Sequence, residues 1–216
     1  MKGRYAMEKV TLEFEVGTIE EWKEKDKEVY KRILEKEMDI NVDYDWWKFT
    51  VEQFQEELGA LGFANTDFNF SGFWSQGDGA SFTGDWNSEK MLTVKELKEK
   101  GIELSDWAVE LRRILKGNLK DIKAKYATFS IKRISHHYYH ENTVDIFNAE
   151  YWNSKKKEQY CIPPEQEDDL LEGCRTAMKA MYRILEKEYD ELTSEEAVEE
   201  TLSVNEYKFD KDGKIW

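Results

Sequence analysis

The chain has 216 residues, of which 14% are aromatic and only 2 are proline, and its formal net charge is −14. Disordered chains are poor in aromatic residues, so this composition predicts a folded protein. The negative charge disfavours direct binding to nucleic acid or to an anionic membrane. The first residues carry no apolar signal-peptide core, and no window holds the roughly 18 apolar residues needed to cross a bilayer. We therefore expect a cytoplasmic location and no membrane partner.

Periodic apolar patterns predict one strand and two helices near the start of the chain. Alternation over residues 10–16 predicts a half-buried strand. A capping box that begins at Thr18 is followed by apolar residues at helical spacing, and together they predict one helix of about five turns. Asp43 or Asp45 can cap a second helix, whose apolar stripe runs to Leu61.

The middle of the chain is rich in strand signals. Two strands are predicted at 66–74 and 79–86, and another at 126–134, followed by a hairpin around residues 140–143. Strands joined by such short turns pair antiparallel, and about five strands are expected in total. Two further helices are predicted from their N-cap residues, Thr93 and Ser105.

Helix signals dominate the C-terminal part. Pro163 and Pro164, followed by acidic residues, predict the start of a long helix, because proline suits the first turn and acids suit its positive end. Thr193 and Glu196 form a capping-box motif that predicts another helix. The chain then ends in a predicted hairpin around Asp212-Gly213.

Together these elements predict the α+β class, with an antiparallel sheet of about five strands packed with several helices, including a long C-terminal helix. We expect a single domain over residues 1–216, with 163–204 as a helical C-terminal segment packed on it. Cys161 and Cys174 have no CxxC or zinc-type spacing, and we expect both to be reduced thiols.

The most unusual stretch is FSGFWSQGDGASFTG, residues 70–84. Its glycines fit a turn that needs positive φ, so one interpretation is purely structural. The other is a surface that contacts a ligand, because aromatic rings beside small polar groups are typical of pockets for a base or a sugar. The candidate ligand-binding residues in this stretch are Trp74, Gln76, Asp78, Ser81 and Phe82.

All 3 histidines lie in SHHYYH, residues 135–140. On an extended strand, His137 and Tyr139 would share one face, and they would line a concave surface with Trp74 if this strand lay beside the 66–86 hairpin. The opposite face would carry His136, Tyr138 and His140. At most two imidazoles converge, and no spacing supplies further ligands, so we predict no metal and no cofactor. Acid–base catalysis by one histidine and a plain stacking role both stay open.

Acidic residues are concentrated in residues 165–200, where 13 Asp and Glu face 4 Lys and Arg. A solvated helical face is one explanation, and mimicry of nucleic-acid phosphates is the other. The carboxylates that would form such a row on one helix are Glu195, Glu196, Glu199 and Glu200. The chain has no phosphate-binding glycine loop, no nucleophile elbow and no HExxH motif, so we predict no catalytic residues.

Several motifs carry a family resemblance. They are INVDYDWW at 40–47, the 70–84 stretch, SHHYYHEN at 135–142, EEAVEET at 195–201 and NEYKF at 205–209. With these motifs the chain resembles an uncharacterised family of small bacteriophage accessory proteins. The resemblance implies a product made in the cytoplasm of the host bacterium, where such proteins often neutralise host defence. It implies no particular site residues.

The leading hypothesis is a phage-encoded anti-defence protein that sequesters a small nucleotide-type immune signal without catalysis. Lys132 or Arg133 would supply the positive charge that a phosphate needs. The alternative is an acidic inhibitor that mimics nucleic acid and blocks a CRISPR or restriction effector, so that the partner is a host defence protein. An enzyme that uses a histidine and a structural module of the virion are further hypotheses. Whether the protein forms a homo-oligomer is left open.

Overall fold

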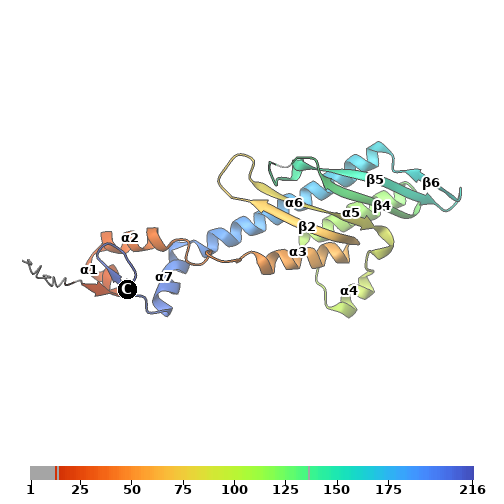
Figure 1. Ribbon diagram of the computed structural model, residues 1–216. Helices are drawn as coiled ribbons and strands as arrows, with labels where there is room; N and C mark the ends of the chain where they lie inside the picture. The colour runs from red at the N-terminus through yellow and green to blue at the C-terminus, as the bar shows by residue number, and fades with distance from the viewer. Residues whose placement is uncertain (1–12, 14, 136) are drawn as a thin grey trace, which may run out of the picture. The chain divides into compact units, whose positions relative to one another are not determined.

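The computed structural model describes residues 13, 15–135 and 137–216 and confirms the α+β class (Figure 1). The chain divides into two compact units. We call residues 47–188 the sheet unit, and the residues up to 46 together with 189–216 the terminal unit. The expectation of one domain over 1–216, with 163–204 packed on it, stays a prediction.

A five-stranded antiparallel sheet forms the centre of the sheet unit, as predicted. Neighbouring strands in the sheet are also neighbours along the chain, in the order β2-β3-β4-β5-β6. Their bounds are β2 Phe63–Ser71, β3 Gly79–Asn87, β4 Ala124–Arg133, β5 Val144–Asn153 and β6 Glu158–Cys161. The hairpin predicted around residues 140–143 is confirmed, since β4 pairs with β5 across that connection.

Helices lie along one face of this sheet, and Figure 1 shows α3, α5 and α6 on that side. The helices of the sheet unit are α3 Lys48–Ala60, α4 Val94–Lys100, α5 Asp106–Asp121 and α6 Pro164–Leu192, whose last residues belong to the terminal unit. Short 3-10 turns occupy Ser88–Lys90 and Glu141–Thr143. The long helix predicted after the proline pair is therefore confirmed.

The core of the sheet unit consists of side chains that point from the sheet toward these helices. Trp86 and Phe129 pack with ring centroids 4.8 Å apart, and the Trp86 indole donates to the backbone oxygen of Leu61 at 2.9 Å. The predicted inward residues of the 126–134 strand are all buried: Ala127, Phe129 and Ile131. Cys174 of α6 is fully buried among such residues, and burial raises the pKa of its thiol to about 12. Both cysteines are free thiols, as expected.

The start of α5 differs from the prediction in one detail. Ser105 is the N-cap residue, but its side chain makes no cap hydrogen bond. Instead its backbone N–H and its hydroxyl both donate to Oε2 of the buried Glu57, at 2.8 and 2.6 Å. This pair of hydrogen bonds ties α5 to α3 inside the unit and satisfies one oxygen of the buried carboxylate, Oε2.

In its described residues, the terminal unit contains three helices and a two-stranded sheet. They are β1 Val16–Gly17, α1 Ile19–Lys25, α2 Lys27–Glu37, α7 Glu195–Val204 and β7 Phe209–Asp210. Its core includes Ile19, Trp22, Ile33 and Phe209, and the Trp22 indole donates to the backbone oxygen of Phe209 at 2.8 Å. Positions 10–12 and 14 of the strand predicted at 10–16 lie outside the described residues.

Two predictions for these helices are wrong. The single helix predicted from Thr18 is two helices, because Asp26 adopts an extended conformation and its carboxylate caps α2 through the N–H groups of Glu28 and Val29. The cap of α7 is Ser194, which accepts from the Ala197 N–H at 3.2 Å. Thr193 instead donates its hydroxyl to the backbone oxygen of Tyr189.

In the described part of the chain, no helix is both long and apolar enough to span a membrane.

Candidate functional site

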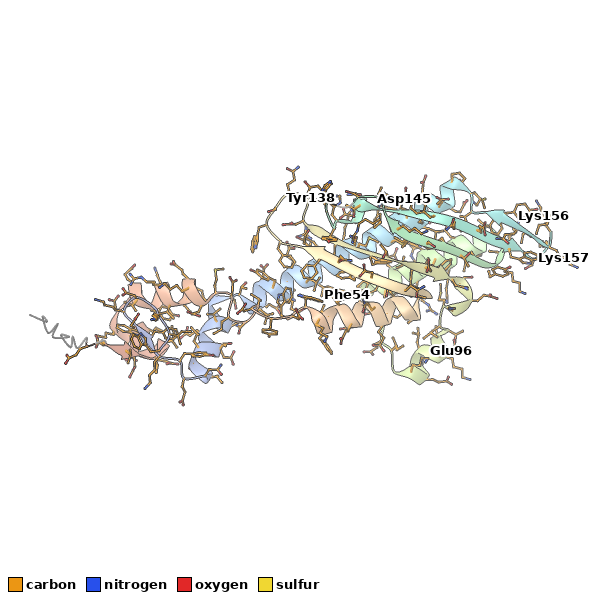
Figure 2. All side chains as sticks on the ribbon, viewed as in Figure 1. Phe54, Glu96, Tyr138, Asp145, Lys156 and Lys157 are labelled. Atoms are coloured by element: carbon orange, nitrogen blue, oxygen red, sulfur yellow. The ribbon has the colours of Figure 1, made fainter. Side chains whose placement is uncertain are left out.

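Two loops of the sheet unit meet at one end of the sheet: the β2–β3 turn, residues 72–78, and the β4–β5 loop, of which residues 134–135 and 137–143 are described. Figure 2 shows Tyr138 at this end and Lys156 and Lys157 at the opposite end. Between the loops lies an open depression of about 580 Å³. Its lining consists of Gln76, Gly77, Asp78, Tyr138, His140, Glu141 and Asn142.

Asp78 organises the β2–β3 turn from within. Its Oδ2 accepts hydrogen bonds from the N–H groups of Trp74 at 3.0 Å and Ser75 at 2.6 Å. A side chain at Gly72 would meet the same oxygen at 2.8 Å, so the turn closes tightly around the carboxylate. The geometry therefore gives Asp78 a structural role in the turn, in addition to its place in the lining of the depression.

Helix α6 anchors the same turn. The Tyr182 hydroxyl donates to the backbone oxygen of Gly72 at 2.9 Å, and the Tyr182 ring stacks on Phe73 with centroids 5.5 Å apart. Burial, together with the nearby charges of Glu186 and Asp78, raises the pKa of Tyr182 and keeps this phenol a donor. The turn is thus held by the helix beneath it and presents a pre-formed wall.

The β4–β5 loop forms the other wall by close approach to glycines. A Cβ atom at Gly77, where φ is +98°, would lie 2.9 Å from the Tyr138 ring, and one at Gly79 would lie 2.5 Å from Cβ of His140. The Tyr138 and His140 rings stack with centroids 6.1 Å apart. Nδ1 of His140 accepts from the Asn142 N–H at 3.1 Å, which places the proton of the neutral imidazole on Nε2. The two glycines thus allow the loops to touch.

Basic side chains surround the base of the β4–β5 loop. The Arg133 guanidinium lies 4.4 Å from the centroid of the Tyr139 ring, Arg175 donates to the backbone oxygen of Val144 at 3.1 Å, and Lys179 pairs with Glu141 at 3.6 Å. Nε of Arg133 and Nε of Arg175 are buried without a hydrogen-bond partner in the described part of the chain. Guanidinium and ammonium groups of this kind can bind an anionic group.

The structure brings some of the predicted ligand-binding residues together. Gln76 and Asp78 line the depression, and Trp74 stands on the same turn with 77% of its surface exposed. Ser81 and Phe82 lie in the interior, where neither side chain has exposed surface for a ligand. The Phe82 ring packs edge-on against Phe63, at 5.4 Å.

The described residues of the SHHYYH segment do not form the strand on which its predicted faces depended, and the assignment of His137 and Tyr139 as ligand contacts stays a prediction. His137 is exposed but does not line the depression, and Tyr139 packs on Arg133; the lining residues are Tyr138 and His140. Residues 134, 135 and 137–140 form no helix or strand, so the strand alternation on which the prediction depended does not apply. His136 lies outside the described residues.

Two other sequence hypotheses concern metals and the acidic row. Among residues 13, 15–135 and 137–216, no three His, Cys, Asp or Glu side chains are grouped to hold a metal ion. The predicted absence of metal, cofactor and catalytic residues stays a prediction.

Glu199 does not belong to a solvated row, because it accepts from Lys23 at 2.5 Å and from the Tyr30 hydroxyl at 2.7 Å.

The Glu199 cluster predicts acid sensitivity of the terminal unit. The hydrogen bonds from Lys23 and then Tyr30 lower the pKa of Glu199 below its ordinary value of 4.5. The folded state therefore favours the charged carboxylate, and its stabilisation is present above about pH 4.5 and is lost as the pH falls through the lowered pKa. We expect Glu199→Gln to remove this part of the pH dependence, measured by unfolding followed through the Trp22 indole signal. Glu200→Gln, at an exposed neighbour, should leave the profile unchanged; equal effects of both changes would contradict the assignment.

The sheet unit corresponds to a recognised domain family. Residues 46–195 match the family DUF8835, described as a domain of unknown function, and the chain belongs to this family. The matched range includes the whole sheet unit, with both loops of the depression. No curated protein and no solved structure matches the chain.

Proposed function

We propose that the protein is a non-catalytic binding protein that captures a small nucleotide-type ligand in the depression between the β2–β3 turn and the β4–β5 loop. The observation that carries the proposal is the pair of pre-formed walls around a space of about 580 Å³. This volume falls within the range of roughly 300–1,000 Å³ that is usual for small-molecule sites. One wall is fixed by Tyr182 and Asp78, and the other by close packing on two glycines.

The lining offers the groups that a nucleoside needs. Tyr138 is 52% exposed and stacked on His140, so a planar base can pack against an already ordered ring. The amides of Gln76 and Asn142 each carry donors and an acceptor, which suits the polar edge of a base. Asp78 adds a carboxylate that can accept hydrogen bonds from ribose hydroxyls.

The same lining disfavours phosphate inside the depression itself. Asp78 and Glu141 are both acidic and would repel an anion. Phosphate would instead have to engage the cations beside the β4–β5 loop, of which Arg133 was predicted from the sequence and Arg175 and Lys179 were not. The proposal therefore divides the ligand into a base-and-ribose part held by the loops and a phosphate part held by these cations.

The biological setting follows from the resemblance to phage accessory proteins. A binding protein without catalysis can neutralise a host defence that signals through a nucleotide by lowering the free concentration of that signal. We propose that the protein acts in this way in the cytoplasm of the infected bacterium. Under this proposal the partner is the nucleotide signal itself. Under the alternative given below, the partner is a host defence protein.

A thermal-shift titration tests the proposal with 3′,5′-cyclic AMP, cyclic di-AMP and ADP-ribose. A ligand at a hundred times its dissociation constant adds about 2.7 kcal/mol to the free energy of unfolding, which is a shift of several degrees for a domain of this size. We expect Tyr138→Ala to abolish the shift. Tyr44→Ala changes a tyrosine of the terminal unit that is 65% exposed, and it should leave the shift intact.

No shift with any of the three nucleotides would overturn the proposal. It would favour the alternative, an acidic inhibitor of a nucleic-acid-binding effector, which charge reversal at the exposed carboxylates Glu195, Glu196 and Glu200 would test. A shift that survives Tyr138→Ala would contradict the proposed position of the site.

A further inference from the structure

The sheet has a second surface, opposite to the buried side chains that face the helices. On this outer face a depression of about 320 Å³ spans strands β2 to β5, and most of the side chains that line it are polar. They include Asn65, Asp85, Thr128, Ser130, Asn148 and Glu150. The site shares no lining residue with the depression between the two loops.

Asp85 is the fixed centre of this outer depression. Its Oδ2 accepts from the Asn65 amide at 3.0 Å, and its Oδ1 accepts from the Ser130 hydroxyl at 2.7 Å. These two hydrogen bonds, from Asn65 and then Ser130, lower the pKa of Asp85, so the carboxylate is ionised at neutral pH. Each oxygen of a carboxylate has two lone pairs, and each therefore retains the capacity to accept a further donor. The carboxylate is thus oriented in advance by residues of two neighbouring strands.

Two irregularities in the sheet carry asparagines to the rim of this depression. The pairing of β2 with β3 shifts between Ala64 and Asp67, and Asn65 there has a φ of 54°. The pairing of β4 with β5 shifts in the same way, and Asn148, also with a φ of 54°, lies at this shift on β5. Asparagine tolerates this backbone conformation better than most residues. Bulges re-aim side chains, and here both bring an amide group to the same surface.

An aromatic pair borders the polar residues. In the sheet register Thr128 faces Glu150, and the next outward pair along the same strands is Tyr126 with Trp152. These two rings are nearly parallel, at 4°, with centroids 6.2 Å apart. The outer face therefore combines a row of carboxylate, amide and hydroxyl groups with a neighbouring pair of aromatic rings.

We propose that this outer depression binds a neutral polyhydroxylated ligand of the sugar class. Hydroxyl groups both donate and accept, which matches the mixture of Asp85, Asn148 and Ser130, and the C–H surface of a sugar can pack beside Trp152. Asp85 and Glu150 disfavour an anionic ligand, and Lys90 in the same lining offsets part of their attraction for cations. The lining has too few apolar side chains for a purely hydrophobic ligand.

The test is an NMR titration of the isotope-labelled full chain with D-ribose, D-glucose and maltose. We expect saturable shifts, for at least one of the three, in the side-chain amides of Asn65 and Asn148 and in the Trp152 indole. Asp85→Ala should weaken this binding about tenfold or more, because a hydrogen bond to a charged group is lost. Asn148→Gly should also weaken sugar binding, because it removes the amide. Glycine adopts the positive φ at this position without strain, so misfolding would not explain the loss of binding.

The matched control is Asp67→Ala on strand β2. Asp67 is exposed and accepts from the Asn69 amide at 3.0 Å, but it does not line the outer depression. Its replacement should leave the titration unchanged. No saturable shift with any of the three sugars, or equal losses in Asp85→Ala and Asp67→Ala, would overturn the proposal. Since Tyr138→Ala tests the site between the loops and Asp85→Ala tests the outer one, failure of one proposal is distinguishable from failure of the other.

Discussion

Phe82→Ala is expected to lower the free energy of unfolding of the sheet unit by about 3–5 kcal/mol, the usual loss for a large aromatic residue in a packed core. Phe82 has no exposed surface and packs edge-on against Phe63 at 5.4 Å. In the sheet register it also faces Phe68 of β2. The measurement is chemical denaturation followed by circular dichroism, with the change read from the transition midpoint at constant slope.

Trp74→Ala is the matched control from the same motif. Trp74 is 77% exposed on the β2–β3 turn, and changes at such surface positions usually stay within about 0.5 kcal/mol. If Trp74→Ala lowered the free energy of unfolding as much as Phe82→Ala, the turn would belong to the core. In that case the interpretation of the turn as a wall of a binding site would be contradicted.

The second large effect is expected at Gly79. A methyl group there would lie 2.5 Å from Cβ and 2.8 Å from Cα of His140, and a backbone atom cannot give way without moving the β4–β5 loop. We expect Gly79→Ala to cost about 1–3 kcal/mol, as for overpacking in other cores, and to weaken nucleotide binding by displacing one wall. Denaturation and the thermal-shift titration measure the two effects.

Gly117→Ala is the same chemical change, but we expect it to raise the free energy of unfolding instead of lowering it. Gly117 lies within α5, and a Cβ there would meet no atom within 4 Å. Alanine is favoured over glycine in a helix by about 0.8–1.0 kcal/mol, so this variant should be stabilised and should bind nucleotide normally. If both substitutions destabilised the protein, the close contact at Gly79 would not be the cause of the stability lost in Gly79→Ala.

Local patterns in the sequence predicted most of the secondary structure, because amphipathic spacing and caps are encoded within a few residues of each element. The capping boxes at Thr18 and Thr93 are both present. The cap of α7 was missed because Ser and Thr are both good N-cap residues, and Thr193 and Ser194 stand side by side. The break between α1 and α2 was missed because the apolar spacing continues through it, although Asp26 is itself a cap residue.

The candidate site was less predictable, because it depends on how two distant loops meet. Alternation predicts faces only in an extended strand, and the loop that carries Tyr138 and His140 is not extended. Ser81 lies on the outward side of β3, yet it is buried. The β4–β5 loop approaches this strand closely, since His140 of the loop contacts Gly79. No local pattern encodes that long-range contact. Gly77 has the positive φ expected of a turn, and both Gly77 and Gly79 also permit a close approach of the β4–β5 loop.

The most direct measurement of the central claim is an NMR titration of the labelled protein with ADP-ribose, 3′,5′-cyclic AMP and cyclic di-AMP. We expect at least one of them to shift the Gln76 and Asn142 side-chain amides and the Gly77 backbone amide, with the three signals giving one dissociation constant. Saturable shifts confined to other parts of the protein, or no saturable shift with any of the three, would contradict the claim that the two loops form a nucleotide-binding site.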